Sequence, residues 1–177
     1  MRKQEGFSLV ELLIVVAIIL IIAAIAVPNL IRAKMTANES AAAAAERTVS
    51  AASVTYASIY NQGYAGSLAQ LGPTSAACAS STSACADLID SALSGIYPVA
   101  DPPVRSHYVF TYLAPNATPA PSTPNNTYSL MATPVSPGPS GKATFCLDQS
   151  NVIKKDASGV AQTALIGGCG TFAGNPM

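Results

Sequence analysis

The chain has 177 residues, of which 50% are hydrophobic and only 10% are charged, with nine basic residues against nine acidic ones. Soluble domains usually carry about 25% charged residues. A neutral, charge-poor chain excludes a histone-like nucleic-acid binder and a highly charged disordered protein. The length allows one ordinary domain, or a smaller domain with an appendage.

The hydrophobic residues are concentrated near the N-terminus, in residues 7–31. Only four residues of this range are not apolar: Ser8, Glu11, Pro28 and Asn29. As a helix the range is about 37 Å long at about 1.5 Å per residue, enough to cross the hydrocarbon core of a bilayer. Two basic residues lie on each side of it (Arg2 and Lys3, then Arg32 and Lys34). Because the basic residues balance, the positive-inside rule gives no orientation.

The apolar range has three possible interpretations, and Glu11 bears on all of them. A cleaved secretory signal would use Ala24-Ile25-Ala26 as its cleavage site. A plain membrane anchor would merely tolerate the acid. A carboxylate in a membrane helix is unfavourable, by up to about 2.5–3.5 kcal/mol at the helix centre. Since neither of these segments gains from that acid, Glu11 favours a third interpretation, in which the carboxylate has a partner.

The residues Gly6-Phe7-Ser8-Leu9-Val10-Glu11, after the charged leader Met1–Glu5, suggest what that partner is. This constellation resembles the class III signal of type IV pilins and type II secretion pseudopilins. The resemblance covers about the first 30 residues, including Pro28. It implies that a prepilin peptidase cuts between Gly6 and Phe7 and methylates the new amine of Phe7.

The resemblance also implies roles for Glu11 and Pro28. In a helical polymer, Glu11 of one subunit meets the cationic Phe7 amine of a neighbour. Because breaking a buried pair leaves an uncompensated charge, this pair would set the register of assembly. Pro28 lacks an amide donor, so we expect a kink or local melting over residues 24–29.

A second helical stretch is predicted to run from Pro28 to about Tyr60, ended by Gly63 and Gly66. Its predicted buried stripe is Ala45, Val49, Ala52, Tyr56 and Ile59. The two stretches form one long helix whose apolar half must be covered by lipid or by copies of itself. The predicted organisation is a leader at 1–6, a transmembrane and assembly helix at 7–31, an amphipathic helix at 32–62 and a globular head at 63–177.

Strand-like patterns lie in the second half of the chain. Residues 107–113 place Tyr108, Phe110 and Tyr112 on one face, and residues 127–133 place Tyr128, Leu130 and Ala132 on one face. Residues 142–148 and 151–154 are predicted to form a hairpin around Gln149-Ser150, while residues 67–104 are predicted to be an irregular connector and 159–177 a loop-like tail. The fold class is therefore α+β, a helix on an antiparallel sheet of about four strands. The resemblance implies the ladle shape of pilins.

The four cysteines are Cys78, Cys85, Cys146 and Cys169. An even number in an exported head indicates two disulfides, for which three connectivities are possible. The short loops favour Cys78–Cys85 and Cys146–Cys169. A zinc site is disfavoured because the chain has no CxxC pair and a single histidine, so neither a metal nor a cofactor is expected.

No catalytic motif is recognisable in the sequence. His107 stands without a nucleophile or acid motif beside it, and Gly138-Pro139-Ser140-Gly141-Lys142 lacks the first glycine and the final Ser/Thr of a phosphate loop. The chain is therefore not expected to be an enzyme.

Two functions from the same family and one from another class remain. The first is a type IV pilin, held in the bacterial inner membrane and then polymerised into an extracellular filament by an assembly ATPase and a platform protein, for adhesion, twitching motility or DNA uptake. The second is a type II secretion pseudopilin. The third is a monomeric membrane-anchored or secreted binding module. The four cysteines and a long variable loop favour the first.

Overall fold

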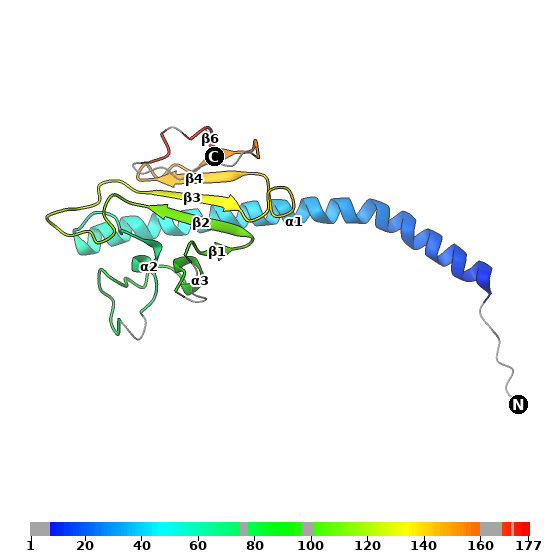
Figure 1. Ribbon diagram of the computed structural model, residues 1–177, viewed down its shortest axis with the longest axis horizontal. Helices are drawn as coiled ribbons and strands as arrows, with labels where there is room; N and C mark the ends of the chain where they lie inside the picture. Colours follow the sequence, from blue (N-terminus) through cyan, green and yellow to red (C-terminus); the bar gives the residue numbers. More distant parts are fainter. Residues whose placement is uncertain (1–7, 75–77, 97–100, 160–167, 171) are drawn as a thin grey trace, which may run out of the picture. The chain divides into compact units, whose positions relative to one another are not determined.

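A computed structural model describes residues 8–74, 78–96, 101–159, 168–170 and 172–177 (Figure 1). The chain divides into two compact units, Met1–Lys34 and Met35–Met177. Helix α1, Leu9–Tyr60, runs through both. We call its part within Met35–Met177 the head half of α1, and that whole unit the head.

The end of α1 lies where the sequence predicts it, at Tyr60. The chain leaves the helix through two residues with positive φ, Asn61 at 51° and Gly63 at 71°. A Cβ atom on Gly63 would lie 2.1 Å from the backbone oxygen of Asn125. Both the backbone angle and this close approach therefore require glycine at the helix exit.

The head contains a sheet in which, among the described residues, six strands follow one another in chain order. They are β1 Val104–Arg105, β2 Tyr108–Leu113, β3 Ser129–Pro134, β4 Thr144–Asp148, β5 Lys154–Asp156 and β6 Asn175–Pro176. Every neighbouring pair is antiparallel. The predicted α+β class with an antiparallel sheet is confirmed. Two strands exceed the predicted number because β1 and β6 are two-residue strands that a periodicity of two does not reveal.

The hairpin after β4 differs from its prediction. Residues 151–153 are not a strand, and β5 begins only at Lys154, which pairs with Cys146. The turn is longer because the Asp148 carboxylate accepts the Ser150 amide at 2.9 Å and Asn151 adopts a φ of 58°. This local turn removes residues that the pattern assigned to the strand.

The head half of α1 packs along one face of the sheet (Figure 1). Four residues of the predicted stripe are buried: Ala45, Val49, Ala52 and Tyr56. They share one core with the helix-facing residues of the strands, which include Tyr108, Phe110, Leu130, Ala132 and Phe145. The inclusion of Ile59 was wrong, because its side chain is 60% exposed. At that point α1 is in its final turn, next to the exit at Asn61.

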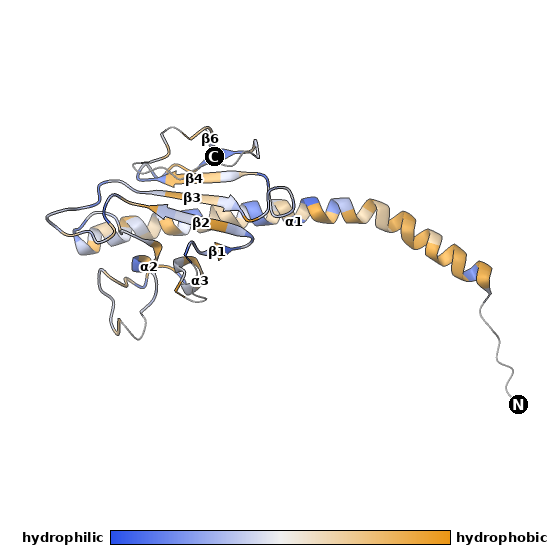
Figure 2. Cartoon of the chain, in the orientation of Figure 1, coloured by the Kyte–Doolittle hydropathy of each residue, from blue (hydrophilic) through white to orange (hydrophobic). Residues whose placement is uncertain are grey.

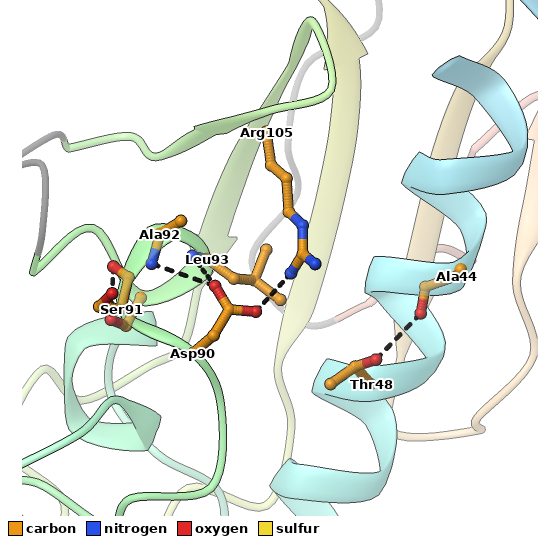
Figure 3. A network of polar contacts seen from close by, with 8 residues as sticks. Ala44, Thr48, Asp90, Ser91, Ala92, Leu93 and Arg105 are labelled. Carbon is orange, nitrogen blue, oxygen red and sulfur yellow. Dashed lines mark hydrogen bonds and ion pairs between the residues drawn. The ribbon is translucent and has the colours of Figure 1, made fainter. Parts of the chain in front are cut away.

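The predicted irregular connector contains two short helices, α2 Leu68–Leu71 and α3 Ser91–Ser94. Asp90 caps α3, since one carboxylate oxygen accepts the amides of Ala92 at 3.1 Å and Leu93 at 2.9 Å. Its other oxygen pairs with Arg105 of β1 (Figure 3). Asp90 therefore joins α3 to the first edge of the sheet.

The outer face of the sheet, opposite α1, is covered in part by the C-terminal segment. Met131, Cys146, Cys169 and Phe172 form a second buried cluster there. Cys169 also donates its amide to Asp148 at 2.7 Å, and its carbonyl accepts the Lys154 ammonium at 2.8 Å. These contacts bind the segment to β4 and β5.

Candidate functional site

The candidate site is the apolar first part of α1, residues 9–31. Every large hydrophobic side chain of this range is exposed, from 47% for Val16 to 78% for Leu9. The helix is long and apolar enough to cross a membrane, and the most apolar window is not buried within the chain. In Figure 2 the ribbon of this part of α1 has an almost continuous hydrophobic colour. Burial of so much apolar surface is strongly favourable, so the helix needs lipid or protein around it.

Glu11 lies in the first turn of α1. Its carboxylate accepts the backbone amide of Ser8 at 3.0 Å, three residues earlier. This is the half of a capping box in which an acid of the first turn satisfies an amide at the helix start. The spacing of Ser8 and Glu11 carried this signal in the sequence. The predicted cleavage and methylation residues, Gly6 and Phe7, lie outside the described residues.

Pro28 lies inside α1, and residues 24–29 are helical. The predicted local melting of residues 24–29 is therefore wrong, while the predicted kink at Pro28 stays a prediction. Proline cannot donate to the carbonyl four residues before it. Next to it, the Asn29 side chain donates to the Ile25 carbonyl at 3.1 Å. This side-chain bond supplies additional hydrogen bonding at a turn weakened by the proline.

The predicted disulfide residues lie in the head, apart from this helix segment. Cys78 pairs with Cys85 at a Cα–Cα distance of 6.4 Å, and Cys146 pairs with Cys169 at 6.0 Å. The first bond closes a surface loop of the connector. The Tyr56 hydroxyl of α1 donates to the Ser83 carbonyl of that loop at 2.7 Å. The second bond joins β4 to the C-terminal segment.

The sequence did not reveal the contacts that attach the head half of α1 to the sheet. The Glu39 carboxylate accepts the amides of Lys142 and Ala143 at 3.1 and 3.2 Å, and the Lys155 ammonium at 3.0 Å. The neighbouring Asn38 amide donates to the Ser140 carbonyl at 2.8 Å. These partners are about 100 residues away along the chain, so no local pattern could have identified them.

Comparison with known proteins identifies the N-terminal segment. Residues 1–27 match the prokaryotic N-terminal methylation motif. A 40-residue stretch is 55% identical to a protein of Thermus thermophilus described as type IV wide pilus major component PilA4. The N-terminal segment of the chain is therefore similar to that of a type IV pilin. The match covers 23% of this chain and 30% of the relative's length. No solved structure matches the chain.

This similarity agrees with the composition of the site. The methylation motif leads directly into an exposed apolar helix, which presents a hydrophobic surface. An α+β head with its long N-terminal helix is consistent with a pilin fold. The sequence similarity is limited to residues 1–27 for the motif and to a 40-residue stretch for the relative.

Proposed function

We propose that this pilin-like chain is a structural subunit of a type IV pilus. The observation that carries the proposal is the methylation motif at residues 1–27, which leads directly into a helix whose apolar side chains are exposed. The relative from Thermus thermophilus is described as a pilus major component. In this proposal the chain is a building block and not an enzyme.

Processing comes first in the proposed sequence of events. The precursor lies in the bacterial inner membrane through residues 7–31. A prepilin peptidase removes residues 1–6 by cutting after Gly6 and then methylates the amine of Phe7. The new amine is cationic and belongs to the residue four positions before Glu11 in the chain. The Glu11 carboxylate caps the helix by accepting the Ser8 amide.

Assembly follows, driven by an ATPase and a membrane platform protein. The apolar helix leaves the lipid and packs against copies of itself, which replaces one apolar environment with another. Glu11 pairs with the Phe7 amine of a neighbouring subunit and selects the register, because a misplaced subunit would leave a carboxylate unpaired in an apolar surrounding. The resulting extracellular filament would serve adhesion, twitching motility or DNA uptake.

N-terminal sequencing and intact-mass analysis of the mature protein test the processing step. We expect a chain that starts at N-methyl-Phe7. A mature chain that starts at Val27 would identify a secreted protein instead, and an uncut chain would identify a plain anchor.

A substitution at Glu11 tests the assembly step. We expect Glu11→Val to be cleaved normally but to yield few filaments in shear preparations, whereas the control Glu11→Asp, which keeps the carboxylate, retains more of them. Abundant filaments from Glu11→Val would contradict the register role.

A separate measurement distinguishes a pilin from a pseudopilin, which shares the same signal. Retention of the wild-type chain in the envelope, with loss of protein secretion on deletion, would identify a pseudopilin.

A further inference from the structure

One buried acid in the head has no part in the proposed assembly. Glu46 lies on α1 between the apolar neighbours Ala45 and Val49, and its side chain has no exposed surface. Neither of its carboxyl oxygens makes a hydrogen bond of normal geometry. Residues of both α1 and the sheet surround it in one hydrophobic core.

No charge on the surrounding elements compensates Glu46. On the helix-facing side, β3 and β4 present only apolar residues: Leu130, Ala132, Phe145 and Leu147. The titratable groups of β2 have other partners, since Tyr108 donates to the Ala143 carbonyl and Tyr112 to the Ala65 carbonyl. The ammonium of Lys155 on β5 binds Glu39.

The charged and polar groups of α1, and Tyr128 next to β3, do not compensate the Glu46 carboxyl either. The Glu39 carboxylate, seven residues before Glu46, already binds the Lys142 and Ala143 amides and the Lys155 ammonium. Arg47 is exposed. The buried hydroxyls of Ser53 and Tyr128 make no hydrogen bond with the carboxyl. Among the described residues, none of these groups forms an ion pair with Glu46.

An unpaired carboxylate in such a core is far less stable than the neutral acid. Burial accordingly raises the pKa of Glu46 well above its ordinary value, and the backbone of Ala132 offsets this only in part. The proton thus belongs to the folded head, while the unfolded chain loses it at ordinary acidic pH.

We propose that the packing of α1 on the sheet is a pH-gated contact: a neutral Glu46 carboxyl holds the helix against the strands, and loss of this proton as the pH rises loosens the head. The device is built into the head alone and does not depend on the proposed assembly. Its opening would expose the core surface of α1, including Val49 and Tyr56, which are fully buried.

The direction follows from proton linkage. The stabilising effect of the buried, neutral Glu46 carboxyl is complete below the pKa of this group in the unfolded chain, about 4.5. It is lost as the pH rises through the higher pKa of the same group in the folded chain. Between these two values, the ratio of folded to unfolded chains falls about tenfold per pH unit through this one group.

The test is the pH dependence of unfolding of the full chain in detergent micelles, compared with Glu46→Gln. Glutamine has nearly the same shape and no charge at any pH. Urea unfolding is followed by the near-ultraviolet circular dichroism of the buried tyrosines, from about pH 5 to pH 9. We expect wild type to lose stability relative to Glu46→Gln by up to about tenfold per pH unit.

Glu39→Gln is the matched control, because it removes the other acid of the same helix face. It should retain the loss of stability with rising pH, since Glu46 is intact. Parallel pH curves for wild type and Glu46→Gln would overturn the proposal. Where Glu46→Gln does not fold, Glu46→Leu replaces it.

Infrared spectroscopy gives a second, independent measurement. Folded wild type just above the ordinary carboxyl pKa of about 4.5 should show the carbonyl stretch of a protonated carboxylic acid, which is absent from Glu46→Gln. A wild-type spectrum without this band would also overturn the proposal, because Glu46 would then be ionised in the folded head.

Discussion

At the scale of single residues, Glu39 shows how one side chain attaches α1 to distant strands. Burial alone would raise the pKa of Glu39, but the Lys142 amide, the Lys155 ammonium and the Ala143 amide together lower it below its ordinary value. Glu39 therefore stays ionised under conditions in which Glu46 stays neutral. Its stabilising effect is present above about pH 4.5 and is lost as the pH falls through the lowered folded pKa.

We predict that Glu39→Ala destabilises the head by about 1–3 kcal/mol at neutral pH, because it leaves backbone amides without an acceptor. The measurement is urea unfolding of the full chain in micelles. The loss should shrink in acid, where wild-type Glu39 is itself protonated. Ser40→Ala, at the exposed neighbouring position, is the control and should change stability little. An equal loss at every pH would show that the carboxylate charge is unimportant.

Asn125 performs a comparable role at the other end of the helix. Its side chain is fully buried. The amide donates to the Asn116 carbonyl at 2.8 Å, and the side-chain oxygen accepts the Asn116 backbone amide at 2.9 Å. The Asn125 backbone bonds to Gln62 and Tyr64 just after α1. Asn125 therefore joins the loop between β2 and β3, whose residues 115–126 include four prolines, to the helix exit.

We predict that Asn125→Ala destabilises the head by about 2–3 kcal/mol, since it leaves buried groups of the Asn116 backbone unpaired. Asn126→Ala is a matched control, because the adjacent asparagine is exposed, and should change stability by less than about 0.5 kcal/mol. Thermal unfolding of both variants makes the comparison. Equal midpoints for the two variants would refute the proposed role of Asn125.

At the scale of elements, the two disulfides differ in the length of chain that they close. Cys78 and Cys85 are separated by 7 positions, and Cys146 and Cys169 by 23. In the chain-entropy account, these loops correspond to about 2.5 and about 3.5 kcal/mol. The second bond also retains Phe172 over Met131 on the outer face of the sheet.

We therefore predict that the double variant Cys146→Ser/Cys169→Ser loses more stability than Cys78→Ser/Cys85→Ser, by about 1 kcal/mol or more. Urea unfolding under oxidising conditions measures the difference. Mapping of non-reduced peptides by mass spectrometry should find the same two pairs in the wild type. A larger loss for the Cys78–Cys85 pair would contradict the loop-length argument.

Elements governed by local pattern were predictable from the sequence, and those governed by distant contacts were not. The alternation of Tyr108, Phe110 and Tyr112 identified β2 because one face of that strand packs on the core. In contrast, Glu46 and Ser53 are buried on α1 although both are polar, and hydropathy assigns such residues to the solvent. β5 was misplaced because the Asp148–Ser150 turn is set by side-chain hydrogen bonds.

The candidate site was predictable from the sequence because its residues form a local pattern. The class III signal and the apolar run are contiguous in the chain, so residues 9–31 needed no tertiary information. The contact between Ser8 and Glu11 also follows a local pattern, because the spacing of three residues fits a capping box. In contrast, the hydrogen bond between Glu39 and the Lys142 amide joins residues 103 positions apart, so it could not be predicted from a local pattern.

At the scale of the whole molecule, the boundary between the two compact units falls within α1, at Lys34–Met35. The head half of the helix therefore belongs with the sheet, whose core residues Tyr108 and Phe145 it covers. The apolar segment before the boundary contributes no side chain to that core. Folding of the head and the proposed membrane insertion thus use different parts of one helix.

We predict that a fragment beginning at Met35 folds without detergent and keeps the urea midpoint of the head in the full chain. The reason is that it retains the buried residues of α1 from Ala42 to Tyr56 together with the strands. The full chain should need lipid or detergent, because its apolar segment remains exposed. Circular dichroism and size-exclusion chromatography make both measurements.

A second fragment beginning at Gly63 is the control for this prediction. It keeps every strand but lacks α1, so the helix-facing residues Phe110, Leu130 and Phe145 lose their cover. We expect it to aggregate or remain unfolded, since an uncovered apolar sheet face is unfavourable in water. A folded, monomeric Gly63 fragment would show that α1 is not part of the core, and aggregation of the Met35 fragment would show that the head depends on the apolar segment.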